Sequence, residues 1–206
     1  MSSPSEPSDM SIVLASGSAI RQKILSDAGL DFEVETRTVD EDALKGALLA
    51  ENVPPRDIAD ALAEAKALAV SRRREADFVV GADQILVLDG RMYDKPKSRG
   101  EARERLRLLR GRTHQLLGAT VVCEGGRPVW RNMARTRLTM RDFSDDFLED
   151  YLDREGELVT RSVGAYRFEG LGAQLFTGVE GDFFAILGLD LLPLLGYLRL
   201  RGAIPS

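Results

Sequence analysis

The sequence predicts a mixed α/β fold built around extended strands. Short apolar runs of strand length alternate with segments whose apolar residues recur at helical spacing. Two turn signals, Asp89-Gly90 and Glu124-Gly125-Gly126, each lie between strand-like stretches and predict hairpins. The 206 residues are 44% hydrophobic, which suffices for a continuous core in one domain or in two small lobes around a cleft.

The first ten residues differ in composition from the rest of the chain. The segment MSSPSEPSDM is acidic and rich in Ser and Pro, which predicts a disordered tail at residues 1–10 before a single domain, with two lobes around a cleft, at residues 11–206. The tail lacks the basic start and apolar stretch of a secretory signal, and no later run has the length of a membrane span. We therefore expect a cytoplasmic protein without a membrane partner.

The first part of the chain predicts strands and helices in alternation. Uninterrupted or alternating apolar residues indicate strands, and apolar residues three or four positions apart indicate helices. Ser18 is a suitable N-cap and Gly29 a suitable end for the first helix. The predicted elements are a strand at residues 12–15, a helix at 19–28, a strand at 32–36, a loop at 39–42 and a helix from 54–55 to about residue 74.

The remainder predicts two hairpins and three further helices. Strand-like stretches at residues 78–80 and 85–88 are separated by a small polar segment, and the Asp89-Gly90 turn returns the chain through Met92 and Tyr93. The other predicted elements are a helix at 98–109 that ends at Gly111, long strands at 114–123 and 129–140, a helix from Ser144 to about residue 153, a Gly-rich aromatic segment at 164–176 and an apolar closing helix at 187–200. No repeat or linker separates independent domains.

Composition limits the chemistry that is available. The chain has 28 basic and 33 acidic residues, a net charge of −5, which argues against a nucleic-acid partner but allows a local basic pocket. Cys123 is the only cysteine, so neither an intramolecular disulfide nor a Cys-based zinc site is possible, and its apolar neighbours predict a buried position. His114 is the only histidine, so acid–base chemistry is expected from a carboxylate or a lysine.

A loop of small residues after the first strand is a candidate phosphate site. Ser16-Gly17-Ser18 leads into a helix, so backbone N–H groups and hydroxyls would face an anion at the positive helix end. Arg21 follows one helical turn after Gly17, and a guanidinium binds such an anion in a bidentate manner. An ordinary capped helix with a surface arginine explains the local pattern equally well.

Asp83 interrupts the apolar run FVVGADQILVL. Burial of an unpaired carboxylate is costly, so Asp83 needs a partner, a metal or a catalytic role, and a structural ion pair is the alternative. Lys95-Pro96 follows a turn and is suited to hold an ammonium over a cleft, although a solvated loop shows the same pattern. Lys66 stands among alanines and leucines on a helix, where its stem would extend to solvent.

Carboxylates also supply the candidate metal ligands. Glu33 and Glu41 accompany Asp83 in this role, because carboxylates with water and phosphate oxygens suit Mg²⁺ or Mn²⁺. The chain has neither a G-x-x-x-x-G-K-[ST] loop nor a G-x-G-x-x-G motif. The residues alone thus predict a phosphate-binding α/β enzyme that a metal assists.

Seven segments, in this order, resemble those of one known family. They are LASGSAIRQKIL at residues 14–25, LAEAKA at 62–67, VGADQILVLDG at 80–90, DKP at 94–96, LRGRTH at 109–114, GAYRFEGLGAQLF at 164–176 and VEGDFFAILGL at 179–189. Each is a weak signal alone, but their shared order is specific. The chain therefore resembles the Maf family of nucleoside triphosphate pyrophosphatases over residues 12–202.

The resemblance implies a fold and an activity. The fold would be the elongated α/β fold of the Maf and inosine-triphosphatase type, with a curved mixed sheet, a deep nucleotide-binding cleft and a homodimeric assembly. The activity would be hydrolysis of a nucleoside triphosphate between the α- and β-phosphates, assisted by Mg²⁺ or Mn²⁺, with water attacking the α-phosphorus. The roles implied for residues are triphosphate binding for Ser16, Ser18 and Arg21, charge neutralisation for Lys66 and Lys95, a place at the reaction centre for Asp83, and help in holding the metal for Glu41.

The resemblance divides over the substrate. Gln84 and Glu169 are similar to the branch that acts on 7-methyl-GTP, and a carboxylate at 169 would accept a hydrogen bond from a guanine N–H edge. GRTH and GAY are more similar to the branch that acts on dTTP and UTP. Asp190 stands where the family usually has proline, which puts the local geometry in doubt. We expect a 7-methyl-GTP or broad nucleotide pyrophosphatase, with the dTTP/UTP branch as the alternative.

Two other functions are compatible with parts of the sequence. A nucleotidyltransferase shares the glycine and arginine of the first loop, but the segments after residue 160 have no place in that pattern. A nucleotide-binding regulator of cell division is the other, because the Maf family is also associated with septum formation. Every proposed catalytic position carries a chemically competent residue, so a regulatory role would coexist with hydrolysis.

Overall fold

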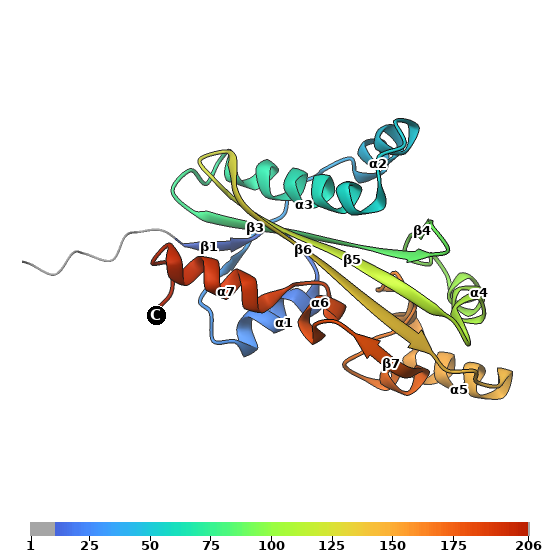
Figure 1. Cartoon of the computed structure of the whole chain (residues 1–206). Helices are drawn as coiled ribbons and strands as arrows, with labels where there is room; N and C mark the ends of the chain where they lie inside the picture. The colour runs from blue at the N-terminus through green and yellow to red at the C-terminus, as the bar shows by residue number, and fades with distance from the viewer. Residues whose placement is uncertain (1–10, 206) are drawn as a thin grey trace, which may run out of the picture.

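The computed structural model describes residues 11–205, so the predicted tail at residues 1–10 lies outside the described residues. Within this part of the chain, seven strands form one mixed sheet in the order β2-β1-β3-β5-β6-β7, with β4 paired to β3 (Figure 1). Neighbours are parallel among β2, β1 and β3 and antiparallel elsewhere. The strands are β1 (Ile12–Leu14), β2 (Glu33–Val34), β3 (Phe78–Leu88), β4 (Arg91–Tyr93), β5 (Thr113–Glu124), β6 (Arg127–Met140) and β7 (Phe176–Glu180).

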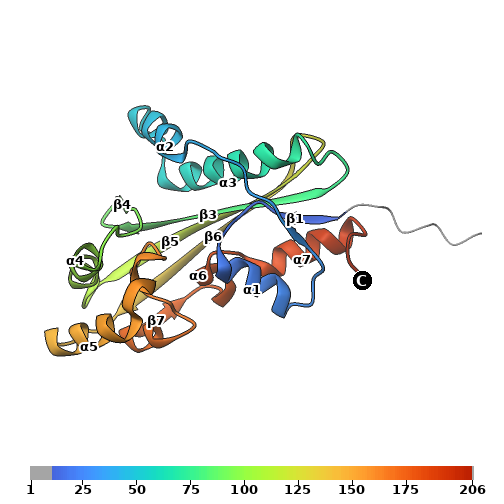
Figure 2. The same ribbon diagram turned by 180° about the vertical axis from the view of Figure 1, so that it is seen from behind.

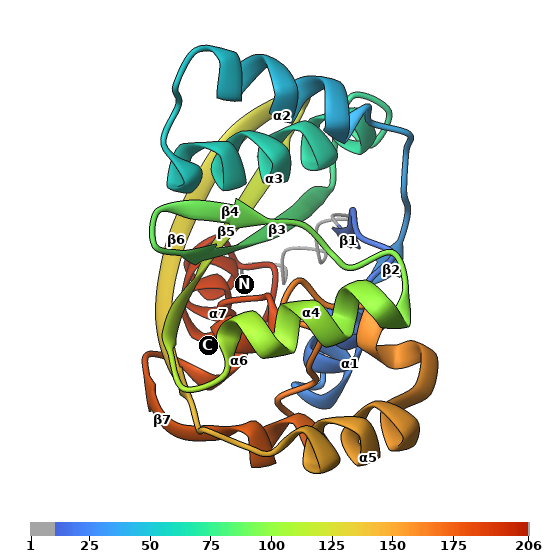
Figure 3. The ribbon, with the colours of Figure 1, turned by 90° about the vertical axis from the view of Figure 1, so that its right-hand side faces the viewer.

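Helices cover both faces of the sheet. Helices α2 and α3 lie on one face, and α1, α6 and α7 lie on the other (Figures 1 and 2). Helices α4 and α5 gather at the end of the sheet that carries β4 (Figure 3). The helices are α1 (Ala19–Asp27), α2 (Glu41–Ala50), α3 (Pro55–Ser71), α4 (Arg99–Leu109), α5 (Asp145–Glu155), α6 (Phe183–Leu187) and α7 (Leu191–Leu200), with short 3₁₀ helices η1 (Gly156–Thr160) and η2 (Leu171–Leu175).

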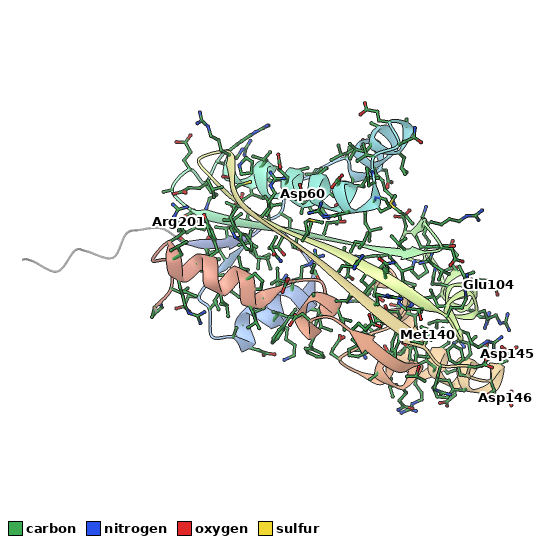
Figure 4. All side chains as sticks on the ribbon, viewed as in Figure 1. Asp60, Glu104, Met140, Asp145, Asp146 and Arg201 are labelled. Carbon is green, nitrogen blue, oxygen red and sulfur yellow. The ribbon has the colours of Figure 1, made fainter. Side chains whose placement is uncertain are left out.

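Three buried apolar clusters hold these layers together. One packs α3 on the sheet, the second packs α1 and α7 on the opposite face, and the third fills the space among α4, α5 and the ends of β5 and β6. Ion pairs brace the β5–β6 hairpin from both sides, because Arg131 binds Asp60 on α3 and Arg201 after α7 binds Glu124. Figure 4 labels Asp60 and Arg201 on these two helical segments. No described helix is long and apolar enough to cross a membrane.

The edge of β3 contains a gap that creates the site. Strand β1 pairs with β3 only as far as Val80, and β4 pairs with it only from Leu86. Both lie on the same edge of β3, because β5 occupies the other edge along residues 79–87. Residues 81–85 therefore lie in the ladder with β5, but no strand of residues 11–205 pairs with them on the open side. The two predicted strands at 78–80 and 85–88 are one continuous strand, and Asp83 lies within it.

Gly81 allows helix α3 to lie directly against this gap. A Cβ on Gly81 would overlap the carbonyl oxygen of Ala63 and lie 2.9 Å from the Cβ of Ala67. Side chains two residues apart on a strand share a face, so Asp83 points to the same side as Gly81. The close approach of α3 therefore brings its Lys66 next to Asp83.

Most predicted elements are confirmed. The structure contains both hairpins, β3–β4 and β5–β6, and the helices expected at 19–28, 54–74, 98–109 and 144–153. Ser98 and Ser144 cap their helices, with hydroxyls that accept hydrogen bonds from the backbone N–H groups of Glu101 and Phe147. Cys123 is fully buried, as its apolar neighbours predict.

Two further predictions are wrong, and one strand is missing from the prediction. The acidic segment at 39–42 is not simply a loop, because α2 begins at Glu41 and the Asp40 carboxylate accepts a hydrogen bond from the N–H of Ala43 at 2.9 Å. The closing helix predicted at 187–200 begins only at Leu191, as α7, because the chain turns at Gly188, where φ is 101°, after the separate short helix α6. The segment at 164–176 leads into strand β7, which the sequence does not predict.

Asp190 has a defined role at the start of α7. It is the N-cap residue, but its side chain does not bond to the helix. Oδ2 accepts a hydrogen bond from Nδ2 of Asn132 on β6 at 2.8 Å instead. A proline could not make this bond, so the departure at this position ties the closing helix to the sheet.

Candidate active site

A cleft of about 1040 Å³ opens along the gap in β3. Its walls come from the β1–α1 loop, α2, α3, the loop after β4, the segment from η1 to Glu169, and the end of α6. Most predicted site residues line this cleft: Ser16, Ser18, Arg21, Glu41, Lys66, Asp83, Gln84, Lys95 and Glu169. Glu33, the remaining candidate metal ligand, lies outside it and forms an ion pair with Arg74 at 2.9 Å instead. Residues from distant parts of the chain therefore meet in one place.

Asp83 and Lys66 form the centre of the cleft. Nζ of Lys66 lies 2.6 Å from Oδ1 of Asp83 and 2.8 Å from Oε2 of Glu41. The side chains of Lys66 and Asp83 are only 16% and 13% exposed, so water screens this pair weakly. Lys66 donates the only hydrogen bond that the Asp83 carboxylate accepts from the described residues, which leaves Oδ2 to bind water, a metal ion or a ligand. Asp83 thus forms an ion pair through Oδ1 and still has Oδ2 available for chemistry.

Lys95 adds a second ammonium from the loop after β4. The pKa of Lys95 is lowered, first because the cleft wall desolvates the ammonium and then because Arg21 and Lys66 repel it, although Asp83 and Glu41 oppose the shift. Mutual repulsion among three cations that have only two carboxylates beside them is relieved when an anion binds. The arrangement is therefore suited to a highly charged anionic ligand.

Arg21 is held differently from the sequence-based expectation. Its Nε donates to the carbonyl oxygen of Gly188 at 2.8 Å, and one terminal nitrogen donates to Ala82 O at 2.8 Å and to Ser16 Oγ at 3.1 Å. These bonds fix the guanidinium between the open edge of β3 and the turn after α6. The other terminal nitrogen has no partner among the described residues, so Arg21 has one face left for an anion.

The serines of the predicted phosphate loop also lie in the cleft. Ser18 is the N-cap of α1, but its hydroxyl does not bond to the helix, and its N–H donates to Ser16 Oγ at 3.3 Å. The Ser18 hydroxyl therefore has no capping duty that would compete with a ligand. Gly17 is exposed between the two serines, which leaves the loop backbone accessible.

Gln84 and Glu169 both lie in the cleft, but they differ in how many of their polar atoms are free to bind a ligand. Nε2 of Gln84 donates to the carbonyl oxygens of Ala185 and Ile186 at 2.8 and 3.1 Å, so only its oxygen remains available to a ligand. Glu169 is exposed on the cleft wall and accepts no hydrogen bond from the described residues. Of the two, Glu169 is the free acceptor.

Buried polar contacts support the segment that carries Glu169. Ala165 has a left-handed backbone with φ of 61°, and its carbonyl oxygen accepts a hydrogen bond from Tyr151. The Tyr166 hydroxyl is hydrogen bonded to Nε2 of His114 at 2.7 Å, and Arg167 forms an ion pair with the buried carboxylate of Glu155 at 2.8 Å. An unusual backbone conformation that several surrounding contacts hold in place is typical of functional sites. The sequence does not predict these contacts, because they join positions up to 52 residues apart.

The cleft is basic although the chain is acidic. Nine basic and five acidic side chains line it, against a net charge of −5 for the whole chain. This local excess attracts and retains polyanions. The sequence does not predict the cleft positions of Lys23, Lys45 and Lys97, and the one available signal is that lysine is rare, with 5 of the 28 basic residues.

The described residues offer limited metal ligation. No group of three or more His, Cys, Asp or Glu side chains among residues 11–205 is arranged to hold a metal ion. Glu41 and Asp83 are the two carboxylates that converge, with the Lys66 ammonium between them. Two carboxylates fit Mg²⁺ or Mn²⁺, which take most remaining ligands from water and phosphate oxygens.

Comparison with known proteins gives consistent matches over nearly the whole chain. The sequence model of the family described as "Maf-like protein" matches residues 11–201. A relative from Caulobacter vibrioides named "Nucleoside triphosphate pyrophosphatase" is 54% identical over 193 residues, which cover 94% of this chain and 96% of the relative. Relatives with the same name from Paramagnetospirillum magneticum and Ruegeria sp. are 50% and 48% identical, and the matches cover 93% and 94% of this chain and 99% and 97% of those proteins.

Proposed function

Because this chain belongs to the Maf-like protein family, we propose that it is a nucleoside triphosphate pyrophosphatase that cleaves its substrate between the α- and β-phosphates. The products would be a nucleoside monophosphate and pyrophosphate. The relatives that share this name and about half of their residues with the chain support the reaction class.

The observation that carries the proposal is the placement of Asp83. Its carboxylate lies at the open edge of β3, with Lys66 at 2.6 Å and with Lys95 and Arg21 close enough to perturb each other. A carboxylate beside several cations suits a reaction in which water loses a proton while a phosphate chain gains charge. A purely structural ion pair would not require a basic cleft of this size around it.

The chain's own residues account for the parts of the step. The water oxygen forms a bond to the α-phosphorus, and the bond from that phosphorus to the α–β bridging oxygen breaks, so pyrophosphate leaves with the bonding electron pair. Oδ2 of Asp83 accepts the proton of the attacking water. Lys66, Lys95 and the free nitrogen of Arg21 stabilise the charge that develops on the phosphates.

A divalent cation completes the proposed site. Glu41 and Asp83 would hold Mg²⁺ or Mn²⁺ together with phosphate oxygens. The ion would supply Lewis-acid polarisation of the phosphate and of a bound water. Lys66 would then orient both carboxylates from one side, since it already contacts both of them.

We propose 7-methyl-GTP as the favoured substrate, with dTTP and UTP as the alternative. Glu169 supports the first, because a free carboxylate accepts hydrogen bonds from a guanine N–H edge and favours the cationic methylated ring. The aromatic side chains of Phe168 and Tyr93 also line the cleft, where a base would lie. The Gln84 amide is turned toward α6 and contributes little to the choice.

A substrate panel tests the proposal. The purified chain is incubated with Mg²⁺ or Mn²⁺ and 7-methyl-GTP, dTTP, UTP, CTP or GTP, and pyrophosphate and orthophosphate are measured separately. Release of pyrophosphate, fastest from 7-methyl-GTP, is expected. Release of orthophosphate alone would place cleavage at another bond, and tight binding without release would favour a regulator.

A further inference from the structure

The five lysines of the chain are distributed in an unusual way. All of them line the cleft, namely Lys23, Lys45, Lys66, Lys95 and Lys97. The other 23 basic residues are arginines, of which four line the cleft and 11 form ion pairs elsewhere on the protein. Lysine offers a compact ammonium with three donors on a flexible stem, which binds phosphate oxygens as a point charge. The distribution indicates that cleft lysines beyond Lys66 and Lys95 also serve the ligand.

Among these lysines, Lys45 has a well-defined helix position, exposure and ion-pair partner. It lies one helical turn after Glu41 on α2, so both side chains are on the same side of the helix, facing the cleft. The Lys45 side chain is only 15% exposed, whereas its ion-pair partner Asp94 is 77% exposed. Asp94 directly precedes Lys95. The Lys45 ammonium therefore lies in the cleft wall, beside the loop after β4 that carries Lys95. Its partner Asp94 is a carboxylate that water can solvate when Lys45 leaves it.

Helix α2 is held on the protein mainly by ion pairs and only slightly by apolar packing. None of its residues is fully buried, and only Leu44 and Leu48 are partly buried against the cluster around α3. Its two ion pairs, Glu41–Lys66 and Lys45–Asp94, connect it to the two walls of the cleft. An anion in the cleft competes for both cations, so the position of α2 responds to the ligand.

We propose that Lys45 is a further substrate-binding residue, which exchanges Asp94 for the β- and γ-phosphates when the triphosphate enters and so draws α2 over the cleft. The exchange replaces the solvated Asp94 carboxylate with a more highly charged partner inside the cleft. The inference rests on the proposed function, because it requires a triphosphate in this cleft.

Two substitutions distinguish a Lys45 that binds substrate from a Lys45 that only holds the Lys95 loop in place through Asp94. Lys45→Met removes the ammonium and should raise KM for the triphosphate about tenfold, with kcat nearly unchanged. Asp94→Asn frees the ammonium and should leave KM unchanged or lower it. Lys45→Arg keeps the charge and should restore part of the affinity. Arg91→Met, which removes an exposed cation outside the cleft, controls for the general loss of positive charge.

The outcomes separate the inference from the function on which it rests. An equal rise in KM for Lys45→Met and Asp94→Asn would show that the pair only braces the loop and would overturn the inference, as would an unchanged KM in Lys45→Met. Absence of pyrophosphate release from any triphosphate by the unsubstituted protein would instead overturn the proposed function. Calorimetric titration with a nucleoside triphosphate and monophosphate adds a direct check, because Lys45→Met should weaken binding of the triphosphate only.

Discussion

Lys66 and Asp83 meet across the interface between α3 and β3, with Nζ and Oδ1 2.6 Å apart. Their contact depends on Gly81, which lies two residues before Asp83 on the same face and permits α3 to touch the strand. A glycine that has no chemistry of its own thus determines how close an ammonium lies to the proposed general base.

Gly81→Ala is predicted to disturb both stability and activity. The added Cβ would overlap the Ala63 carbonyl oxygen, so α3 must move away, at a cost of about 1–3 kcal/mol. The move also separates Lys66 from Asp83, so kcat should fall by more than the loss of folded protein explains. Urea denaturation and steady-state kinetics measure the two effects.

Gly118→Ala is the matched control for Gly81→Ala. Gly118 lies on β5 opposite Gln84, and a Cβ there would meet only the Cβ of Ala134 at 3.9 Å. Its unfolding free energy should change by less than about 0.5 kcal/mol. Equal effects of the two substitutions would contradict the role given to Gly81.

Glu169→Gln is predicted to change the substrate preference. Loss of the anionic acceptor should lower kcat/KM for 7-methyl-GTP about tenfold relative to dTTP, since hydrogen bonds to charged groups contribute about 1.5–3 kcal/mol. Competition assays with both nucleotides measure this ratio directly. Glu157→Gln, an exposed change on η1 outside the cleft, should leave the ratio unaltered. An unchanged ratio in Glu169→Gln would argue for the dTTP/UTP branch.

His114 should make the protein less stable as the pH falls from 7 to 5. Burial lowers the pKa of His114 from 6.5 to about 4, so the unfolded chain takes up a proton in this range and the folded protein does not. Stability from this residue is therefore complete above the unfolded pKa and is lost between pH 6.5 and pH 4. The expected loss between pH 7 and pH 5 is about 2 kcal/mol.

His114→Gln tests this dependence because glutamine retains a hydrogen-bonding group for Tyr166. Urea denaturation at pH 7 and at pH 5 gives the change in unfolding free energy for each protein. The variant should lose less stability than the unsubstituted protein over this interval. An identical loss in both would assign the acid sensitivity to other groups.

Local patterns predict much of the fold. Asp89-Gly90 and Glu124-Gly125-Gly126 mark the two hairpins, and Ser98 and Ser144 mark helix starts, because turns and caps depend on a few adjacent residues. The start of α2 was also marked, since Asp40 is followed by two acidic residues in the first turn. The prediction of a loop at 39–42 follows from the charge of this cluster and misses the capping signal of Asp40.

Local sequence patterns do not predict contacts between residues that are far apart in the chain. Arg21 is predicted in the cleft, but its bonds to Gly188 and Ala82 depend on where α6 and β3 lie. The late start of the closing helix, at Leu191, also follows from tertiary packing, because Arg21 lies beneath the turn at Gly188, where a Cβ would be 3.4 Å from the guanidinium. The resemblance to a family predicts a more complete set of site residues than the separate sequence patterns do.

The most direct test of the central claim is hydrolysis in oxygen-18 water with mass analysis of the products. Attack of water on the α-phosphorus predicts that the heavy oxygen appears in the nucleoside monophosphate, and that turnover is lost in Asp83→Asn but retained in Asp142→Asn, which changes an exposed aspartate. Heavy oxygen in pyrophosphate, or near-normal turnover in folded Asp83→Asn, would contradict the account.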